Sequence, residues 1–349
     1  MKNEIINLLK QLIATPSFSK EENKTADIID EFLSKKGLQT QRSGNNIWAR
    51  SKFWNAEKPI ILLNSHHDTV RPVSNWTYDP FKPTVEKDQL FGLGSNDAGA
   101  SLVSLIATFL HFYEVQDLPF NLIIAATAEE EISGKNGIAS ILSQLGKIDL
   151  GIVGEPTEMQ MAIAEKGLMV IDGLAEGKAG HAARKEGINA IYIALEDIDF
   201  LRNFDFQKHA SLLGNIKISV TQIEAGTQHN VVPDQCKFVI DIRTNENYSN
   251  QEVFRILQEK CQSKLSPRSF RLNSSKIDLD HPIVQKGLDL GLNYYGSPTL
   301  SDQALMPFTT IKIGVGDSAR SHTANEFVLL SEIEEGIEIY KKLLNGLIL

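Results

Sequence analysis

The sequence predicts a two-domain protein: an α/β domain with a mostly parallel sheet, interrupted by a small ferredoxin-like α+β domain. Its 349 residues suit two domains better than one. Short apolar runs alternate with helical stretches at both ends of the chain, as in α/β domains. The middle has the order β-α-β-β-α-β, which is typical of a ferredoxin-like fold.

The N-terminal segment is expected to form two helices. Apolar residues recur at helical spacing in the first, which ends before Pro16. Ser19 followed by Glu22 predicts a capping box at the start of the second helix. That helix is expected to run through Lys36 and to end at Gly37.

The α/β domain is expected to continue with buried strands and covering helices. The apolar runs are continuous rather than alternating, which indicates strands covered on both faces. Strands are predicted at 59–65, 120–128, 148–154 and 309–317, and helices at 100–113, 136–145 and 281–296.

The middle segment carries the predicted inserted domain. Its strands are expected at 167–177, 214–226, 234–244 and 268–275, and its helices at 187–204 and 250–262. We therefore place the inserted domain at 166–274 and the α/β domain at 1–165 and 275–349.

Composition excludes several classes of partner. The formal net charge of −9 argues against nucleic acid or an anionic membrane surface. Cys236 and Cys261 have no ligand-like spacing, so reduced thiols in a cytoplasmic protein are expected. The N-terminus lacks a signal-peptide pattern, and no apolar run is long enough to span a bilayer.

The stretch ILLNSHHDTV ends a predicted buried strand in two histidines and an aspartate. Residues two apart in a strand point the same way, so His66 and Asp68 share a face and His67 points away. His66 is thus a candidate metal ligand that Asp68 can orient. Taken alone, this stretch is more often structural than metal-binding: a histidine ends the strand and an aspartate forms the turn after it.

Other predicted strands also end in candidate ligands. Asp97 lies in a glycine-rich turn before a helix, where an N-cap is the simpler reading. Glu155 and His322 follow two further strands. Taken alone, each is more simply explained as an ordinary turn or loop residue. Glu130 and Glu131 belong to a run of three glutamates after a buried strand, and such crowding repels unless a cation offsets it.

These side chains are expected to meet, because the carboxyl ends of strands in an open α/β sheet share the edge where ligands bind. Histidines and carboxylates together match borderline divalent metals such as zinc. The number of ligands exceeds the need of one tetrahedral site and indicates two metals. Two ions roughly 3.5–4 Å apart can hold an attacking water and a substrate oxygen.

Two other site classes do not fit the sequence. GLGSNDAG loosely matches a dinucleotide-binding loop, but the strand before it is poor and Asp97 would face the pyrophosphate. The chain contains neither a P-loop lysine pattern nor a G-x-S-x-G nucleophile elbow.

The motifs HHDTV, GLGSND, AEEE, GEPT, GKAGHAA and SHTANE occur in this order. Together they resemble the di-zinc family of acetylornithine deacetylase, succinyl-diaminopimelate desuccinylase, aminoacylase and carboxypeptidase G, over nearly the whole chain. The resemblance implies a phosphorylase/hydrolase-like catalytic domain with an inserted dimerisation domain. It also implies a zinc-dependent amidohydrolase, with cobalt as a second possible metal, that acts as a homodimer on a small N-acyl amino acid.

The family pattern implies a role for each strand-end residue. His66, Asp97 and Glu155 would hold one metal, and His322 and Glu131 would hold the other with Asp97 bridging. Glu130 would be the general base that deprotonates the bridging water and then protonates the leaving nitrogen. The run of glutamates leaves that register open by one residue, and the flanking Ala128 and Gly134 favour Glu130.

The inserted domain would supply further contacts. His181 matches a family histidine that reaches the partner's active site and stabilises an oxyanion, although it could simply cap a turn. Arg243 matches an arginine for the substrate carboxylate, and Asn230 an asparagine near the acyl carbonyl. For both, an inter-strand structural hydrogen bond is an open alternative.

The resemblance makes N-acetyl-L-ornithine, in arginine biosynthesis, the first expected substrate. N-succinyl-ornithine, N-acetyl-citrulline, succinyl-diaminopimelate and dipeptides stay open. Two departures from the family pattern argue against assuming the substrate of a well-known member. Gly99 stands where the family often has a lysine, and Glu129 stands where an aspartate is more usual. A non-catalytic binding protein of the same fold is the alternative from another class, and the intact ligand set argues against it.

Overall fold

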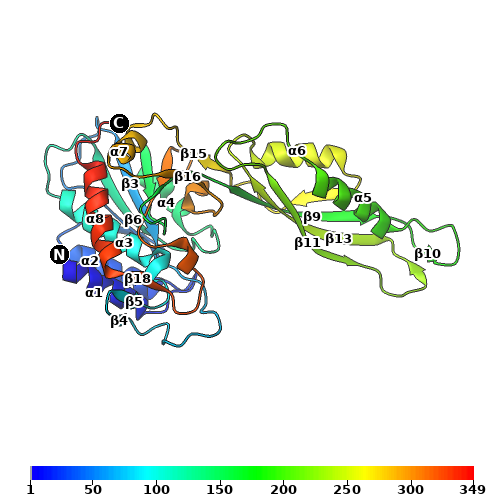
Figure 1. Ribbon diagram of the computed structural model, residues 1–349, viewed down its shortest axis with the longest axis horizontal. Coiled ribbons are helices and arrows are strands. Elements are labelled where there is room, and N and C mark those ends of the chain that lie inside the picture. The colour runs from blue at the N-terminus through cyan, green and yellow to red at the C-terminus, as the bar shows by residue number, and fades with distance from the viewer. Residues whose placement is uncertain (1) are drawn as a thin grey trace. The chain divides into compact units, whose positions relative to one another are not determined.

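The computed structural model describes residues 2–349, which form two compact units (Figure 1). The second unit comprises Ala164–Ser275 and Gly296–Leu300, and the first comprises the remainder. The sequence pattern assigns residues 296–300 to the α/β domain, but they belong to the second unit. One physical reason is that the backbone N–H of Lys166 donates to the carbonyl of Ser297 at 3.1 Å.

The first unit is built on a nine-stranded sheet. The strand order is β1-β2-β6-β3-β7-β17-β8-β15, and β16 pairs with β8. Strands β6, β3, β7 and β17 run parallel to their neighbours within this group. The bounds are β1 Thr40–Ser43, β2 Asn46–Arg50, β3 Ile60–His66, β6 Asn121–Thr127, β7 Leu150–Val153, β8 Met161–Glu165, β15 Ser275–Lys276, β16 Tyr294–Ser297 and β17 Thr310–Lys312.

Helices cover both faces of this sheet (Figure 1). On one face α3 packs against β3, β6, α1 and α8, and nearly all its residues are buried. On the other face Ile138 and Ile141 of α4 join a core with Leu62 and Ile123. The bounds are α1 Lys2–Ile13, α2 Asn23–Lys35, α3 Ala100–Phe112, α4 Ile138–Leu145, α7 Pro282–Asp289 and α8 Leu330–Leu344. The predicted α/β class with a mostly parallel central sheet is confirmed.

Two local predictions in this unit are wrong. Ser19 and Glu22 form no capping box: α2 begins at Asn23 with no side-chain cap. The Ser19 hydroxyl donates to Asp68 at 2.7 Å, and Glu22 accepts from the backbone N–H of Glu129 at 3.2 Å, so both residues serve the strand-end loops. The helix expected at 281–296 ends at Asp289, and the left-handed Gly291 turns the chain into β16.

A small antiparallel sheet of β4 Thr84–Glu86, β5 Gln89–Phe91 and β18 Phe327–Leu329 completes the first unit. Phe327 in β18 is paired with Phe91 in β5. This pairing brings the segment after His322 alongside the loop that leads to Asp97.

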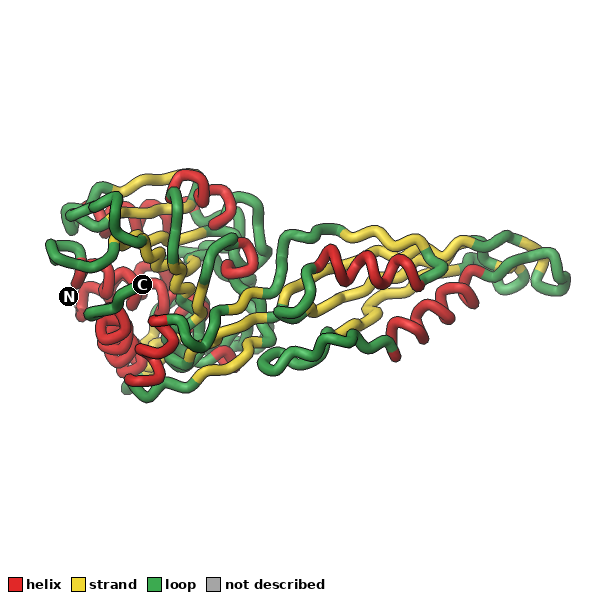
Figure 2. Tube along the Cα trace, turned by 90° about the horizontal axis from the view of Figure 1, so that it is seen from above, coloured by secondary structure: helices red, strands yellow, loops and turns green. Residues whose placement is uncertain are grey.

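The second unit has the predicted ferredoxin-like order. The elements are β9 Gly167–Glu176, α5 Ala190–Asn203, β11 Lys217–Ala225, β13 Gln235–Thr244, α6 Asn250–Lys260 and β14 Lys264–Pro267. The antiparallel sheet has the order β11-β13-β9-β14. The last strand comes earlier than the predicted 268–275, since β14 pairs with β9 through Lys264–Pro267. A short ribbon of β10 Gly180–His181 and β12 Val231–Val232 extends this unit (Figure 2).

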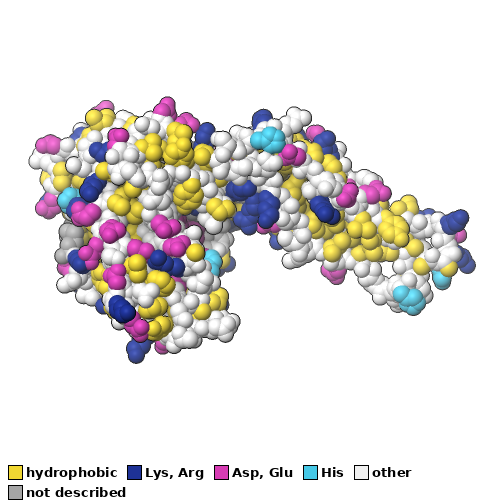
Figure 3. Space-filling model, viewed as in Figure 1, with side chains coloured by type: hydrophobic (Ala, Val, Ile, Leu, Met, Phe, Trp, Pro, Cys, Tyr) yellow, Lys and Arg dark blue, Asp and Glu magenta, His cyan; other side chains and the backbone are white. Residues whose placement is uncertain are grey.

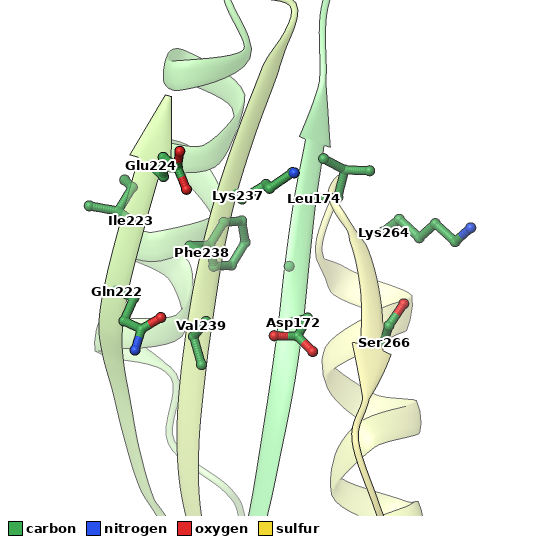
Figure 4. A pocket seen from close by; sticks show the side chains of 11 residues that line it. Asp172, Leu174, Gln222, Ile223, Glu224, Lys237, Phe238, Val239, Lys264 and Ser266 are labelled. Carbon is green, nitrogen blue, oxygen red and sulfur yellow. The ribbon is translucent and has the colours of Figure 1, made fainter. Parts of the chain in front are cut away.

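The sheet of the second unit is covered on one face. Residues of β9 and β13 such as Ile171, Phe238 and Ile240 are buried against α5 and α6. The opposite face carries an open groove of about 680 Å³ between β11 and β14 (Figure 4). Its lining mixes apolar and charged side chains, including Leu174, Val239, Asp172, Lys237 and Lys264. None of the helices within residues 2–349 is long and apolar enough to cross a bilayer.

Candidate metal centre and active site

His66 stands at the end of β3 and is buried among carboxylates. Its Nε2 lies 3.2 Å from Asp97 Oδ1, 3.8 Å from Glu155 Oε1 and 3.9 Å from Glu130 Oε2. Its Nδ1 lies 2.9 Å from the backbone carbonyl of Asp68. Because Nδ1 is engaged there, Nε2 is the ring atom directed at the carboxylates.

His322 approaches the same cluster from another loop. Its Nε2 lies 2.9 Å from Glu131 Oε2 and 3.6 Å from Asp97 Oδ2. The side chain is 53% exposed, and the backbone has the left-handed φ of +59°, which is uncommon for a residue other than glycine. Asp97 therefore lies between two histidines, with one carboxylate oxygen nearer to each.

Asp68 holds the turn that carries the glutamates. Its Oδ1 accepts a hydrogen bond from the backbone N–H of Glu130 at 3.0 Å, and its Oδ2 accepts one from Glu131 at 3.2 Å. Oδ1 is 3.5 Å from His66 Nδ1, farther than the backbone carbonyl of the same residue. His66 is thus oriented chiefly by that carbonyl, and the Asp68 carboxylate fixes the two glutamates.

The three consecutive glutamates point in different directions. Glu129 has a φ of +55°, and its carboxylate accepts from Asn136, at 2.8 Å from the side chain and 3.3 Å from the backbone. Glu130 lies beside His66, and Glu131 lies beside His322. Glu129 therefore stays outside the cluster, whereas Glu130 and Glu131 both belong to it.

The structure decides whether Asp97 is a helix N-cap and in which direction the His67 side chain points. Asp97 is not the N-cap of α3, because Gly99 occupies that position. His67 points away from His66, with Nδ1 2.9 Å from the Thr25 hydroxyl and Nε2 2.8 Å from the Asn45 carbonyl. Burial lowers the pKa of His67 to about 4, so this ring is a neutral structural group.

Burial and the crowding of carboxylates shift the pKa values of several residues in the cluster. Burial raises the pKa of Glu155 to about 8, and burial together with the charge of Glu155 raises the pKa of Glu130 well above its usual value. Burial would lower the pKa of His66, but Glu155, Asp68 and Asp97 raise it well above the usual value. The hydrogen bond to Glu131 raises the pKa of His322 to about 9.

The cluster fits divalent metal ions. Within residues 2–349, Glu155 Oε1 is buried without a hydrogen-bond partner. Candidate ligand atoms of His66, Asp97 and Glu131 lie within 4.8 Å of one another, and so do those of His66, Glu130 and Glu155. Nitrogen and carboxylate donors of this kind suit zinc and similar ions. A cation would satisfy the orphaned oxygen and offset the repulsion between the acids.

The other predicted site residues belong to the second unit. His181 on β10 is exposed, and its Nδ1 accepts from the backbone N–H of Ala183 at 3.1 Å, as expected of a turn residue. The carbonyl of Asn230 accepts from the N–H of Ala182 at 3.0 Å, so His181 and Asn230 are neighbours. Arg243 is separate from them on β13 and forms a bidentate pair with Asp241 at 2.8 and 3.1 Å.

Sequence reasoning missed two buried carboxylates near the cluster. Asp302 accepts from Asn64 Nδ2 at 3.0 Å and from the Thr127 hydroxyl at 2.9 Å, behind the ends of β3 and β6. Nothing in the surrounding TLSDQA marks it in the sequence. Glu326 accepts from the loop that carries Asp97. It is the last residue of SHTANE, so its place in that motif was an available signal.

The α/β fold and the carboxylate–histidine cluster at one sheet edge define the class of a metal-dependent hydrolase. The model of Peptidase family M20/M25/M40 matches residues 62–346, so the chain belongs to that family and is a hydrolytic enzyme.

The chain is similar to several known members along most of its length. It is 28% identical over 354 residues to a peptidase M20 domain-containing protein of Schizosaccharomyces pombe, covering 98% of this chain and 84% of that protein. It is 26% identical over 377 residues to a succinyl-diaminopimelate desuccinylase of Psychromonas ingrahamii, covering 99% and 98%. A Bacillus subtilis structure described as a dinuclear metal-binding M20 peptidase shares the fold, with a TM-score of 0.76, 18% identity and coverage of 98% and 97%.

We expect the metal-free protein to lose stability as the pH rises from about 7 to 8.5. The raised pKa values of Glu155 and His322 mean that the folded state binds more protons than the unfolded state in this range. Stability falls with pH wherever the folded state binds more protons. The measurement is the thermal midpoint of chelator-treated protein at both pH values.

A metal should reverse this trend, because ligands release their protons on binding and metal affinity then rises with pH. Glu155→Gln should flatten the slope of the metal-free protein. A midpoint that rises with pH in the metal-free wild type would contradict the cluster described above.

Proposed function

We propose that the protein hydrolyses the amide bond of an N-acyl amino acid with two divalent metal ions, most simply zinc, with cobalt as a substitute. The observation that carries this proposal is the gathering of His66, His322 and four carboxylates at one sheet edge, with Glu155 Oε1 left unpaired. His66, Asp97 and Glu155 would hold one ion, and His322, Asp97 and Glu131 the other.

When bound, such ions lower the pKa of a water molecule and polarise the amide carbonyl. Glu130 would accept a proton from the attacking water and deliver it to the nitrogen as the C–N bond breaks. Burial and the charge of Glu155 raise the pKa of Glu130, which makes its carboxylate a stronger acceptor for the proton of the attacking water. Asp68 would keep Glu130 in place through the backbone hydrogen bond at 3.0 Å.

The proposal also concerns the substrate, that is, which acyl group is removed from which amino acid. N-acetyl-ornithine is the substrate favoured by motif resemblance alone. The relatives named succinyl-diaminopimelate desuccinylase, at 24–26% identity in three cases, favour a succinylated substrate. We therefore carry both substrates forward, together with dipeptides.

Charges in the second unit also favour an anionic substrate. Burial and the charges of Lys217 and Arg243 lower the pKa of Lys166, so three cationic groups are close together. Asp241 occupies Nε and Nη2 of Arg243. Within residues 2–349, Nη1 has no hydrogen-bond partner and could receive a carboxylate.

We also propose a homodimer formed through the second unit. Exposed apolar side chains occur on and before α5 and on the edge strand β11, namely Ile188, Tyr192, Leu195 and Ile223. Helix α5 contacts β11, and apolar side chains gather over the second unit in Figure 3. An edge strand beside an apolar helix face can pair with the same surface of a second copy.

The experiment that tests the function is turnover of zinc-loaded protein against matched acetyl and succinyl forms of ornithine, citrulline and diaminopimelate, with dipeptides as a separate set. Hydrolysis of one acyl series is the expected result. Hydrolysis of dipeptides alone would replace the deacylase assignment by a peptidase, and no hydrolysis despite bound zinc would overturn the proposal.

A further inference from the structure

Glu326 is 2% exposed, and its carboxylate faces the loop that carries Asp97. Its Oε1 accepts from the backbone N–H groups of Asn96 at 2.8 Å and Asp97 at 3.0 Å. Its Oε2 accepts from the N–H of Gly94 at 3.1 Å. Glu326 therefore binds the backbone of the candidate metal ligand Asp97 and of two residues that precede it, Gly94 and Asn96.

The segment before Glu326 is joined to the same loop a second time. Asn96 Oδ1 accepts from the backbone N–H of Asp317 at 3.0 Å, and Asn96 Nδ2 donates to the Asp317 carbonyl at 3.1 Å. The N–H of Gly92 donates to the carbonyl of Glu326 at 3.0 Å. His322 lies between these two attachments, so the loops that carry Asp97 and His322 are held as one body.

A carboxylate suits this position for a chemical reason. Three N–H donors converge on two oxygen atoms, and an ionised carboxylate accepts at both. A glutamine at this position has the same shape but only one acceptor oxygen. Its NH₂ group would face a backbone N–H donor. Burial of a charge is costly, and the three backbone donors offset part of that cost.

We propose that Glu326 is a positioning residue that fixes Asp97 and His322 relative to each other. It thereby sets the affinity of the metal position that these two residues share with Glu131. This inference rests on the proposed two-metal function. Glu326 reaches neither the substrate nor the metal, since its carboxylate is engaged with backbone N–H groups.

A purely structural role is the alternative, because Glu326 immediately precedes β18. Asp197 offers a matched control: it is a buried carboxylate on α5 that accepts from the backbone N–H groups of Gln262 at 2.9 Å and Ser263 at 2.7 Å. Asp197→Asn therefore removes the same kind of interaction in the second unit, which carries no candidate metal ligand.

The test compares Glu326→Gln, Asp197→Asn and wild type after complete metal removal, by titration with zinc in a calorimeter. Glu326→Gln should weaken one of the two zinc positions about 10–100-fold, the usual effect of removing a residue that orients a ligand. The other position and both positions of Asp197→Asn should keep their affinity. Excess zinc should restore turnover of Glu326→Gln, which loss of fold would not allow.

A second readout needs no metal. Amide hydrogen exchange at Gly94, Asn96 and Asp97 should be faster in metal-free Glu326→Gln than in metal-free wild type. Glu326→Asp keeps the charge but withdraws the oxygens from the loop, so it should show the same selective loss.

Equal zinc affinities in Glu326→Gln and wild type would overturn the inference and leave the two-metal function intact. Loss of fold in both Glu326 variants would overturn it too, by showing a role in folding. A wild type that binds no zinc would instead overturn the proposed function on which the inference rests.

Discussion

Replacing Glu130 by alanine is expected to lower the turnover number about 10²–10⁴-fold, the usual effect of losing a general base, while both metals stay bound. Glu130 lies in the cluster 3.9 Å from His66, yet the metals would have five other ligands. Replacing Glu131 by alanine should instead release one metal, because its carboxylate faces His322 at 2.9 Å. Steady-state kinetics and metal analysis of the purified variants check both outcomes.

Glu129→Gln is the matched control, since this neighbouring side chain faces Asn136 and not the cluster. Its turnover should stay near that of wild type. Metal loss in Glu130→Ala together with full metal content in Glu131→Ala would show that the two roles are exchanged.

Replacing His181 by alanine is expected to lower turnover about 10²–10³-fold, the scale for losing one oxyanion donor. Nδ1 of this exposed histidine accepts from Ala183, so the neutral ring carries its proton on Nε2. Within residues 2–349, Nε2 has no hydrogen-bond partner and is available to a substrate carbonyl. The thermal midpoint should change little, and replacement of the nearby exposed His229 should leave turnover unchanged.

A mixed dimer separates the two ways in which His181 could act. A Glu130→Ala chain is combined with a His181→Ala chain that carries a different affinity tag, and the heterodimer is purified. If each active site uses the partner's histidine, one site regains both groups and activity returns in part. If the histidine serves its own chain, both sites stay defective. No recovery in a verified heterodimer, or an active monomer, would rule out action across the interface.

The sequence predicted the part of the site that strand order determines. His66 ends β3, and Glu130, Glu131 and Glu155 follow β6 and β7; these parallel strands bring their carboxyl ends to one edge. Asp97 was expected by the same argument, but it follows β5 of the small antiparallel sheet and reaches the cluster from there. Continuous apolar runs such as that of β3 indicated the strands, because strands covered on both faces have that composition.

Interactions between distant segments could not be predicted in the same way. Ser19 and Glu22 matched a local capping pattern, but Asp68 and Glu129, far away in sequence, compete for their side chains. Asp302 joins the cluster through Asn64 and Thr127 on two other strands, and no local pattern reports such a contact. The pairing of Arg243 with Asp241 depends on the shared sheet face of residues two apart, which leaves its role with substrate open to test.

The most direct test of the account is a cobalt titration of metal-free enzyme, with turnover of the best N-acyl amino acid and bound cobalt measured in the same samples. Two metals at the cluster of His66, Asp97 and His322 predict no turnover without metal and two bound equivalents at saturation. The same titration of Glu131→Ala should saturate at one equivalent. Full turnover in rigorously metal-free wild type, or saturation of wild type at a single equivalent, would contradict the two-metal centre.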